Sequence, residues 1–199
     1  MSMIIGLTGT IASGKDIIAD VLKKRGFIAL SLSDEVREEA KVRGIELTRE
    51  NLQKLGNDMR KEFGNGILAQ RILMKITNPQ KNYVINGIRN TSEITELKNW
   101  PSFYLMAVDS PQQTRFQRMM TRNRPSDPKN FYEFTKVDAI DLGQGQDNSG
   151  QQVAACMKMA DCSIFNDFSV ERLTDKVNFM VQQIMNKDTV TTGKVAYNN

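Results

Sequence analysis

The segment GTIASGKD, from Gly9 to Asp16, combines two glycines and a lysine at a spacing that suits the binding of phosphate groups. It follows the pattern G-x-x-x-x-G-K-[ST], except that an aspartate stands in the last position. Gly9 and Gly14 allow a tight turn in which successive backbone N–H groups point inward, and a helix starting near Lys15 adds the positive end of its dipole. The ammonium group of Lys15 supplies a point charge for the outer phosphates. The expected phosphate-binding residues are Gly9, Thr10, Ile11, Ala12, Ser13, Gly14, Lys15 and Asp16.

Asp16 occupies the position at which a hydroxyl normally contacts a magnesium ion. A carboxylate can bind Mg²⁺ directly, because that ion prefers oxygen ligands. The negative charge also lies close to the phosphates and repels them unless a metal ion lies between. We therefore expect Asp16 to be a magnesium ligand, to preserve nucleotide binding and to make that binding more dependent on magnesium.

A second candidate group is a run of arginines in RFQRMMTRNR, residues 115–124. Arg115, Arg118 and Arg122 are spaced three and four apart, so they share one face of a helix. A row of guanidinium groups favours an anionic partner, and a transferring phosphoryl group is such an anion. The alternative is a solvated basic face.

The elements that must position these groups alternate between strands and helices. Apolar runs predict strands at 3–8, 27–32, 83–88, 103–109 and 162–166. Helices are expected at 15–25, after Ser33 as the capping residue, at 48–76 with a break at 63–66, at 92–99, after Pro111 and at 169–187, with a polar glycine-rich loop at 141–152. This alternation predicts a parallel sheet covered on both faces, and a strand and helix around 9–16 favour a phosphate loop over an ordinary glycine turn.

Composition limits the function further. The 199 residues suffice for one domain, and the absence of a run of about 20 apolar residues argues against a membrane span. The N-terminus lacks the basic segment of a signal peptide, so a cytoplasmic protein is expected. Cys156 and Cys162 match no metal-binding spacing and are expected to be reduced thiols, and the absence of histidine excludes Ser-His-Asp triads. The net charge of +4 suits small anions, and no basic patch interleaved with aromatic residues indicates a nucleic-acid partner.

Several of these motifs together resemble a known family. GLTGTIASGKD, a strand ending in SLSD and the following REEA are similar to the phosphate-loop nucleotide kinases of the nucleoside-monophosphate-kinase-like branch. Dephospho-coenzyme A kinase resembles the chain at Asp34 and Arg37, and archaeal adenylate-kinase-like proteins resemble it in SDEVREEAKVRG and INGIRN. The ending ADCSIFNDFSVERL is similar to both.

The resemblance covers residues 3 to about 185. It implies an α/β fold, the three-layer α/β/α P-loop NTPase fold, with a five-stranded parallel sheet and a small helical lid at about 115–150. It also implies a single kinase domain at 1–187 and a flexible tail at 188–199.

The resemblance also implies roles for individual residues. Asp34 would orient the acceptor, although helix capping is the alternative, and Arg37 would hold the acceptor's anionic group unless it is a solvated surface arginine. Asn86 stands where the family has an acid that holds magnesium through water. The family's magnesium site has thus gained one acid, Asp16, and lost one at Asn86, which keeps the number of charges if both lie in the same shell. Arg89 follows on the same loop and would face the substrate.

Other regions matched by the resemblance supply the remaining candidates. Thr48, Arg49 and Arg60 fall where the monophosphate kinases bind the acceptor nucleotide. Asn166 falls where the nucleotide base is cradled, or it is a turn residue.

The expected activity is an ATP- and Mg²⁺-dependent phosphoryl transfer to a small nucleotide-like acceptor, either a (deoxy)nucleoside monophosphate or dephospho-coenzyme A. The expected catalytic residues are Lys15, Asp34, Arg118 and Arg122, and the expected acceptor-binding residues are Arg37, Arg60, Arg89 and Arg115. A nucleotide-binding sensor with little transfer activity is the alternative, favoured by Asp16 and Asn86. Neither a nucleic acid nor a membrane is expected as a partner, and the number of subunits stays open.

Overall fold

The computed structural model describes residues 2–124, 127–167 and 169–195, with side chains through residue 186. Its strands are β1 (Ile4–Gly9), β2 (Ile28–Ser31), β3 (Tyr83–Ile88), β4 (Phe103–Asp109) and β5 (Cys162–Phe165). Its helices are α1 (Lys15–Lys24), α2 (Leu32–Val42), α3 (Arg49–Phe63), α4 (Ile67–Met74), α5 (Thr91–Leu97), α6 (Gln112–Arg122), α7 (Phe131–Leu142), α8 (Val153–Lys158) and α9 (Val170–Val195).

The five strands form one parallel sheet in the order β2-β3-β1-β4-β5, as predicted. β1 is central and its residues are buried on both faces, which explains its nearly continuous apolar sequence IIGLTG. Parallel strands end at the same edge of a sheet, so the segments that follow β1, β2 and β3 meet there.

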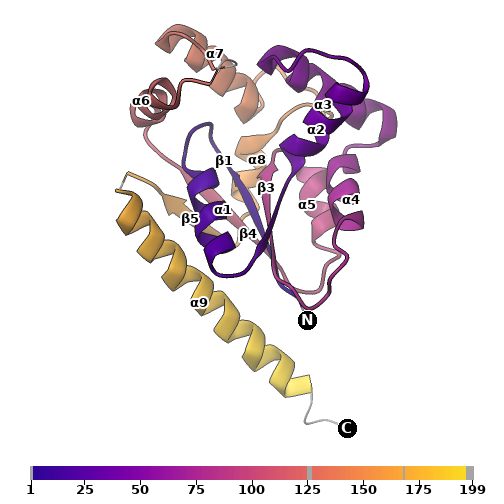
Figure 1. Cartoon of the computed structure of the whole chain (residues 1–199), viewed down its shortest axis with the longest axis vertical. Helices are drawn as coiled ribbons and strands as arrows, with labels where there is room; N and C mark the ends of the chain where they lie inside the picture. The colour runs from indigo at the N-terminus through magenta and orange to yellow at the C-terminus, as the bar shows by residue number, and fades with distance from the viewer. Residues whose placement is uncertain (1, 125–126, 168, 196–199) are drawn as a thin grey trace.

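Helices cover both faces of the sheet, which gives the predicted three layers (Figure 1). On one face, α1 and α9 pack on sheet residues such as Ile5 and Val108. On the other, α2, α3, α4, α5 and α8 pack on residues such as Ile4, Tyr83 and Ile85.

Helices α6 and α7 form a separate helical unit beyond the carboxyl edge of the sheet (Figure 1). Their core is small and consists of Met119 and Phe134 together with Ile11 from the loop after β1. Arg115 also donates a hydrogen bond to the backbone oxygen of Ile11. The tip of the loop is therefore packed into this α6–α7 unit, which falls within the lid expected at 115–150.

The start of α2 differs from the prediction that Ser33 caps this helix. Ser31 is the N-cap and α2 begins at Leu32, directly after β2. Leu32 is fully buried, and beginning the helix there places Leu32, Val36 and Ala40 on one core-facing stripe. Burial of Leu32 thus outweighs the capping preference of Ser33.

Other differences concern the second half of the chain. The sequence did not predict α7 or α8, and α7 includes Asp141, which was expected in a loop. α9 continues to Val195, past the expected end near Lys187. Residues 196–199 of the expected tail lie outside the described residues.

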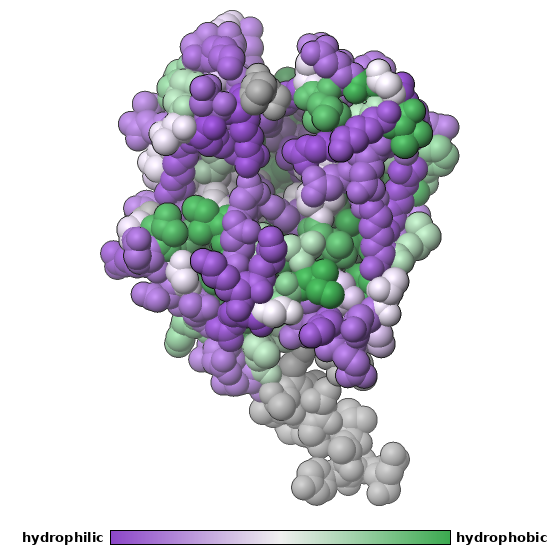
Figure 2. Space-filling view, viewed as in Figure 1, coloured by the Kyte–Doolittle hydropathy of each residue, from purple (hydrophilic) through white to green (hydrophobic). Residues whose placement is uncertain are grey.

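Two further predictions concern the cysteines and membrane-spanning helices. Cys156 and Cys162 are not joined by a disulfide bond, which agrees with the expected reduced thiols. None of the described helices is long and apolar enough to cross a membrane. The face seen in Figure 2 is mainly hydrophilic, with small apolar groups between the polar ones.

Candidate functional site

The loop between β1 and α1 has the backbone of an anion-binding turn. Gly9 and Gly14 have φ values of 136° and 107°, which favour glycine. A Cβ atom at Gly9 would overlap the backbone oxygen of Val108, so this position also requires glycine for space. Ala12 has a φ of 57°, an unusual value for a residue with a side chain. Unusual backbone conformations of this kind cluster at functional sites.

Lys15 folds back onto this loop. Its Nζ donates hydrogen bonds to the backbone oxygens of Gly9, at 2.8 Å, and Thr10, at 2.6 Å. Burial, reinforced by the guanidinium of Arg89, lowers the pKa of Lys15 from 10.5 to about 7. The lysine is thus held at the centre of the loop with a charge that an anionic ligand would stabilise.

Asn166 braces the loop from behind. It is buried, and its Nδ2 donates a 2.7 Å hydrogen bond to the backbone oxygen of Ser13. A Cβ atom at Gly14 would lie 2.5 Å from the same Nδ2. The side chain does not lie where contact with a nucleotide base was expected. Its amide packs against the loop, and Asn166 is not among the residues that line the cavity described below.

Asp16 lies at the mouth of the loop and has two partners. Asn86, near the end of β3, donates a 2.8 Å hydrogen bond to Asp16 Oδ1, and Arg124 forms a 3.1 Å ion pair with Asp16 Oδ2. Desolvation raises the pKa of Asp16, but these hydrogen bonds outweigh it and hold the pKa below its ordinary value. Asp16 is therefore a carboxylate at neutral pH. Asn86 and Asp16 belong to one small group, as expected from their compensating changes of charge.

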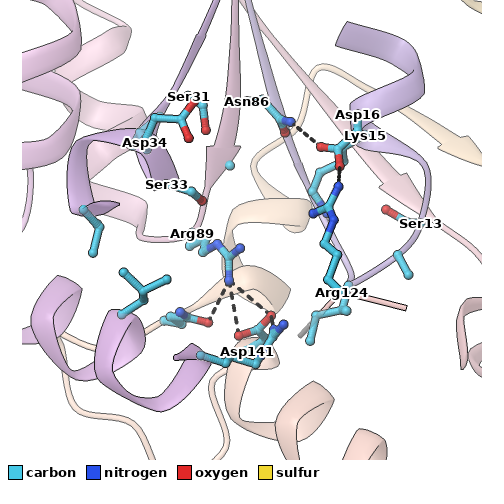
Figure 3. Close-up of a pocket in the computed structure, with 18 of the residues that line it drawn as sticks. Ser13, Lys15, Asp16, Ser31, Ser33, Asp34, Asn86, Arg89, Arg124 and Asp141 are labelled. Carbon is cyan, nitrogen blue, oxygen red and sulfur yellow. Dashed lines mark hydrogen bonds and ion pairs between the residues drawn. The ribbon is translucent and has the colours of Figure 1, made fainter. Parts of the chain in front are cut away.

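A cavity of about 950 Å³ opens in front of the loop. Figure 3 shows Lys15, Asp16 and Asn86 on one side of it and Ser33 and Asp34 on another, with Arg89 reaching in between. Its polar lining residues are Ser13, Lys15, Asp16, Ser31, Ser33, Asp34, Arg37, Arg49, Gln53, Arg60, Asn86, Arg89, Arg118, Arg122, Arg124, Asp127, Asp141 and Gln151. The structure thus brings most of the predicted site residues to one cavity.

Asp34 and Arg37 line this cavity from the first two turns of α2. Arg37 Nη1 forms a 2.6 Å ion pair with Asp34 Oδ1, and both side chains are largely exposed. Asp34 is therefore near the loop but is already paired with the residue expected to bind the acceptor.

The arginines of α6 do not form the row of unpaired guanidinium groups that their spacing predicted. Arg122 makes a two-pronged ion pair with Asp127, with both distances 2.8 Å. Arg118 donates to Ser110 Oγ at 3.1 Å and to the backbone oxygen of Asn166 at 3.2 Å. Both arginines still line the cavity.

Arg115, which was predicted to bind the acceptor, forms a buried ion pair between α6 and α7. Its side chain is 5% exposed and lies outside the main cavity lining. It is paired with the buried Asp138 of α7, with a 2.8 Å hydrogen bond from Nη2 to Oδ2. Arg115 therefore joins α6 to α7.

Arg60 is also mainly structural. It lines the cavity, but its Nε and Nη2 donate to Glu93 Oε1 at 3.1 Å and 2.8 Å. Glu93 is fully buried and also completes the capping box of α5 with Asn90. Most of the donor capacity of Arg60 is therefore already used.

The sequence reasoning missed the acid at the centre of the site, Asp141. Asp141 forms ion pairs with Arg49 and with Arg89. For Arg49 the sequence indicated only a region that binds the acceptor nucleotide. Gln151, also missed, accepts a hydrogen bond from Arg89. These contacts join residues 52 to 92 positions apart, so no local pattern could have indicated them.

Among the described residues, no three acidic, cysteine or histidine side chains form a metal-binding group. A magnesium ion here would need non-protein ligands beside Asp16, which is usual for Mg²⁺ bound with phosphates and water.

Comparisons with known proteins place this geometry in a family. A family model described as an AAA domain matches residues 5–139. A UPF0200 protein of Hyperthermus butylicus is 31% identical over 183 residues, which cover 92% of this chain and 95% of the relative. A UPF0200 protein of Pyrococcus abyssi is 33% identical over 189 residues, covering 92% and 97%.

The chain belongs to the AAA-domain family and to the UPF0200 proteins. Solved structures with the same fold include kinases. Shikimate kinase from Acinetobacter baumannii has a TM-score of 0.57 and 14% identity, covering 94% of this UPF0200 protein and 95% of the kinase. The APS kinase CysC of Mycobacterium tuberculosis has a TM-score of 0.52 and 16% identity, covering 91% and 98%. This confirms the expected fold for the UPF0200 chain.

Proposed function

We propose that this UPF0200 protein is an ATP- and Mg²⁺-dependent phosphotransferase that acts on a small nucleotide-like acceptor. One observation carries the proposal: the ammonium group of Lys15 lies in a glycine-rich loop that opens on the same cavity as Arg118, Arg122 and Arg124. Kinases with this fold include an APS kinase solved with AMPPNP and APS, which supports a nucleotide donor and an anionic acceptor.

On the donor side, the residues present fit a metal-bound triphosphate. The Oδ1 atom of Asn86 is buried and has no hydrogen-bond partner among the described residues, beside the carboxylate of Asp16. Two neighbouring oxygen atoms of this kind suit Mg²⁺. Asp16 and Asn86 would hold the ion, which would supply positive charge to neutralise the phosphate groups.

The protein's own groups would act by position and charge. Backbone N–H groups of the loop and Lys15 hold the terminal phosphates, while Arg118 and Arg122 stabilise charge at the phosphoryl group. Asp34 accepts a hydrogen bond from the acceptor through Oδ2 and so orients it, because Arg37 pairs with Oδ1. The α6–α7 unit is the proposed lid that excludes water.

The acceptor side of the cavity supports a nucleotide-like ligand. It combines the apolar side chains of Val36, Leu52 and Leu68 with the cations Arg37 and Arg89. A (deoxy)nucleoside monophosphate or dephospho-coenzyme A has both an apolar part and an anionic part, and the monophosphate is the first choice.

A nucleotide sensor is the second candidate. Asp16 forms its ion pair with Arg124, and this pair and the missing acid at Asn86 are the observations that favour it. Such a protein would bind ATP without passing its phosphate on.

An ADP-release assay with ATP, magnesium and a panel of acceptors tests the proposal. The panel contains the ribo- and deoxynucleoside monophosphates and dephospho-coenzyme A, and each is compared with acceptor-free hydrolysis. We expect turnover with at least one acceptor, abolished in Lys15→Ala and retained in Lys23→Ala, which removes an exposed lysine of the same helix. Tight ATP binding without turnover on any acceptor would instead establish the sensor.

A further inference from the structure

Asp141 holds two arginines of the cavity at once. Its carboxylate, at the end of α7, is only 5% exposed. Oδ2 accepts from Arg49 Nη2 at 3.1 Å, and Arg89 Nη1 lies 3.3–3.4 Å from its two oxygens (Figure 3). Arg49 begins α3 and Arg89 follows β3, so one carboxylate connects three separate elements.

The position of Arg89 is fixed from several directions. Its backbone N–H donates to Glu93 Oε2 at 2.8 Å, and its backbone oxygen accepts from the N–H of Gln152 at 2.6 Å. Its Nη1 also donates to Gln151 Oε1 at 3.3 Å. All side-chain hydrogen bonds from Arg89 to described residues use Nη1, so Nε and Nη2 stay available for a ligand.

The charges of this group do not balance. Two guanidinium groups share one carboxylate, which leaves one net positive charge on the cavity wall. Burial lowers the pKa of the Arg49 guanidinium, although Asp141 opposes that shift. Lys15 also lies within electrostatic range of both Arg89 and Asp141, so the group lies close to the phosphate loop. A partly buried excess of positive charge favours an added anion.

The geometry points to Asp141 as a positioning residue that aligns Arg49 and Arg89 on the phosphate monoester of the acceptor. This inference rests on the proposed function, since it assigns the acceptor's anionic group to one place in the cavity. Planar guanidinium groups bind phosphate oxygens through pairs of N–H donors, and that geometry depends on their orientation. Because Asp141 belongs to α7, the alignment of the arginines depends on the ion pair that joins the end of α7 to Arg49 of α3.

Asp141 does not need to touch the acceptor to act in this way. Replacing it with asparagine raises the net charge of the group from +1 to +2, so anion binding does not weaken. The two guanidinium groups are then no longer held, and phosphoryl transfer suffers because it depends on alignment. The expected signature is a fall in kcat without a rise in KM at an unchanged folded fraction, because partial unfolding alone would also lower the apparent kcat.

Equilibrium binding tests the arginine pair without any turnover. Calorimetry compares the 5′-monophosphates of adenosine, guanosine, cytidine, uridine and thymidine with their uncharged nucleosides. We expect at least one monophosphate to bind about tenfold or more tightly than its nucleoside, and this preference to fall about tenfold in Arg49→Ala and in Arg89→Ala. It should persist in Lys15→Ala, which affects the donor loop. An unchanged preference in both arginine variants would overturn the assignment.

Three variants and a control test the positioning role. Asp141→Asn should bind the monophosphate within threefold of wild type or more tightly, while kcat falls about tenfold. Arg49→Lys and Arg89→Lys keep the charge without the planar fork and should behave alike. Asp58→Asn removes an exposed acid of α3 that lies outside the cavity, and it should change neither parameter.

If no acceptor is turned over, a spectroscopic measurement tests the positioning role of Asp141. The Nε–H signals of Arg49 and Arg89 in ¹⁵N NMR should be sharp in the wild type and broadened in Asp141→Asn. Unchanged arginine signals or, where turnover exists, an unchanged kcat in Asp141→Asn would overturn the positioning role. Failure of the proposed function alone would appear only as absent turnover, with the binding preference and the arginine signals as expected.

Discussion

Asn86 Nδ2 donates a 2.8 Å hydrogen bond to Asp16 Oδ1. Asp16 departs from the usual phosphate-loop pattern, and Asn86 stands where the family that the chain resembles has an acid. The bond gives the carboxylate a fixed orientation and leaves the Oδ1 atom of Asn86 without a partner among the described residues. Placing a hydroxyl at 16 and an acid at 86 would preserve the number of charges around a metal ion.

This relationship predicts the magnesium dependence of ATP binding. In Asp16→Ser no acid remains in the pair, and the gain in affinity from magnesium should fall about tenfold. In the double variant Asp16→Ser with Asn86→Asp the gain should return. Calorimetry with magnesium or with a chelator measures it, and Asp20→Ser serves as the control because it removes an exposed acid of α1. A double variant that has lost the magnesium effect would rule out compensation.

The pKa of Lys15 predicts that ATP binding takes up a proton. Burial lowers this pKa to about 7 in the free protein, and bound phosphates would raise it again. Affinity should therefore fall as the pH rises from 7 to 9, by up to about tenfold per pH unit. Titrations at pH 8 in two buffers of different ionisation enthalpy measure the proton directly. Lys15→Arg should bind without this pH dependence, and zero proton uptake in the wild type at pH 8 would contradict the prediction.

The same shift affects folding with a definite sign. Lys15 titrates near 7 in the folded chain and near 10.5 when unfolded, so the unfolded chain binds more protons between these values. The contribution of Lys15 to stability should therefore increase with pH from about 7 to 10.5. Subtracting urea denaturation curves of Lys15→Met from those of the wild type, at pH 7 and pH 9, isolates this contribution. An equal difference at both pH values would argue against a lowered pKa.

Arg115 and Asp138 should determine stability rather than catalysis. Arg115→Met leaves a buried carboxylate unpaired and should lower the free energy of unfolding by about 3–5 kcal/mol. The double variant Arg115→Met with Asp138→Leu should recover most of this loss. Urea denaturation measures both, with Lys54→Met as an exposed ion-pair control that should cost less than about 1 kcal/mol. A stable Arg115→Met protein that binds the acceptor poorly would restore the role first predicted for Arg115.

Substitution of Asn166 distinguishes two roles for its side chain, bracing of the phosphate loop and recognition of the nucleotide base. If its amide braces Ser13, Asn166→Ala should lower stability by about 1–3 kcal/mol and weaken ATP and GTP binding by equal factors. If it recognised the nucleotide base, the ratio of ATP to GTP affinity would change instead. Binding titrations with both nucleotides separate these outcomes.

The sequence predicted the parts of the fold that local patterns determine. The phosphate loop has its own signature, and buried parallel strands such as β1 and β3 are largely apolar runs bounded by polar residues. Helix α7 was not predicted because its apolar residues do not form a clear stripe. Buried acids interrupt them: the apolar residues are Phe131, Phe134, Val137 and Ile140, and the acids are Asp138 and Asp141. A sequence pattern does not show that a buried acid has a distant partner.

The sequence also predicted only part of the candidate site. Lys15, Asp16, Asp34 and Arg89 follow β1, β2 and β3, and the ends of parallel strands meet, so their convergence followed from the topology. The arginines of α6 were more difficult, because their value as ligands depends on which acids are nearby. Arg122 forms an ion pair with Asp127, and Arg115 forms one with Asp138. Only the folded chain shows these pairs.

The most direct test of the account is calorimetric titration of ATP with magnesium into the wild type, Lys15→Ala and Lys23→Ala. The account predicts binding at one site, weakened about 10- to 150-fold in Lys15→Ala by loss of a charge-assisted contact and unchanged in Lys23→Ala. No binding at millimolar ATP, or equal binding by wild type and Lys15→Ala, would contradict it.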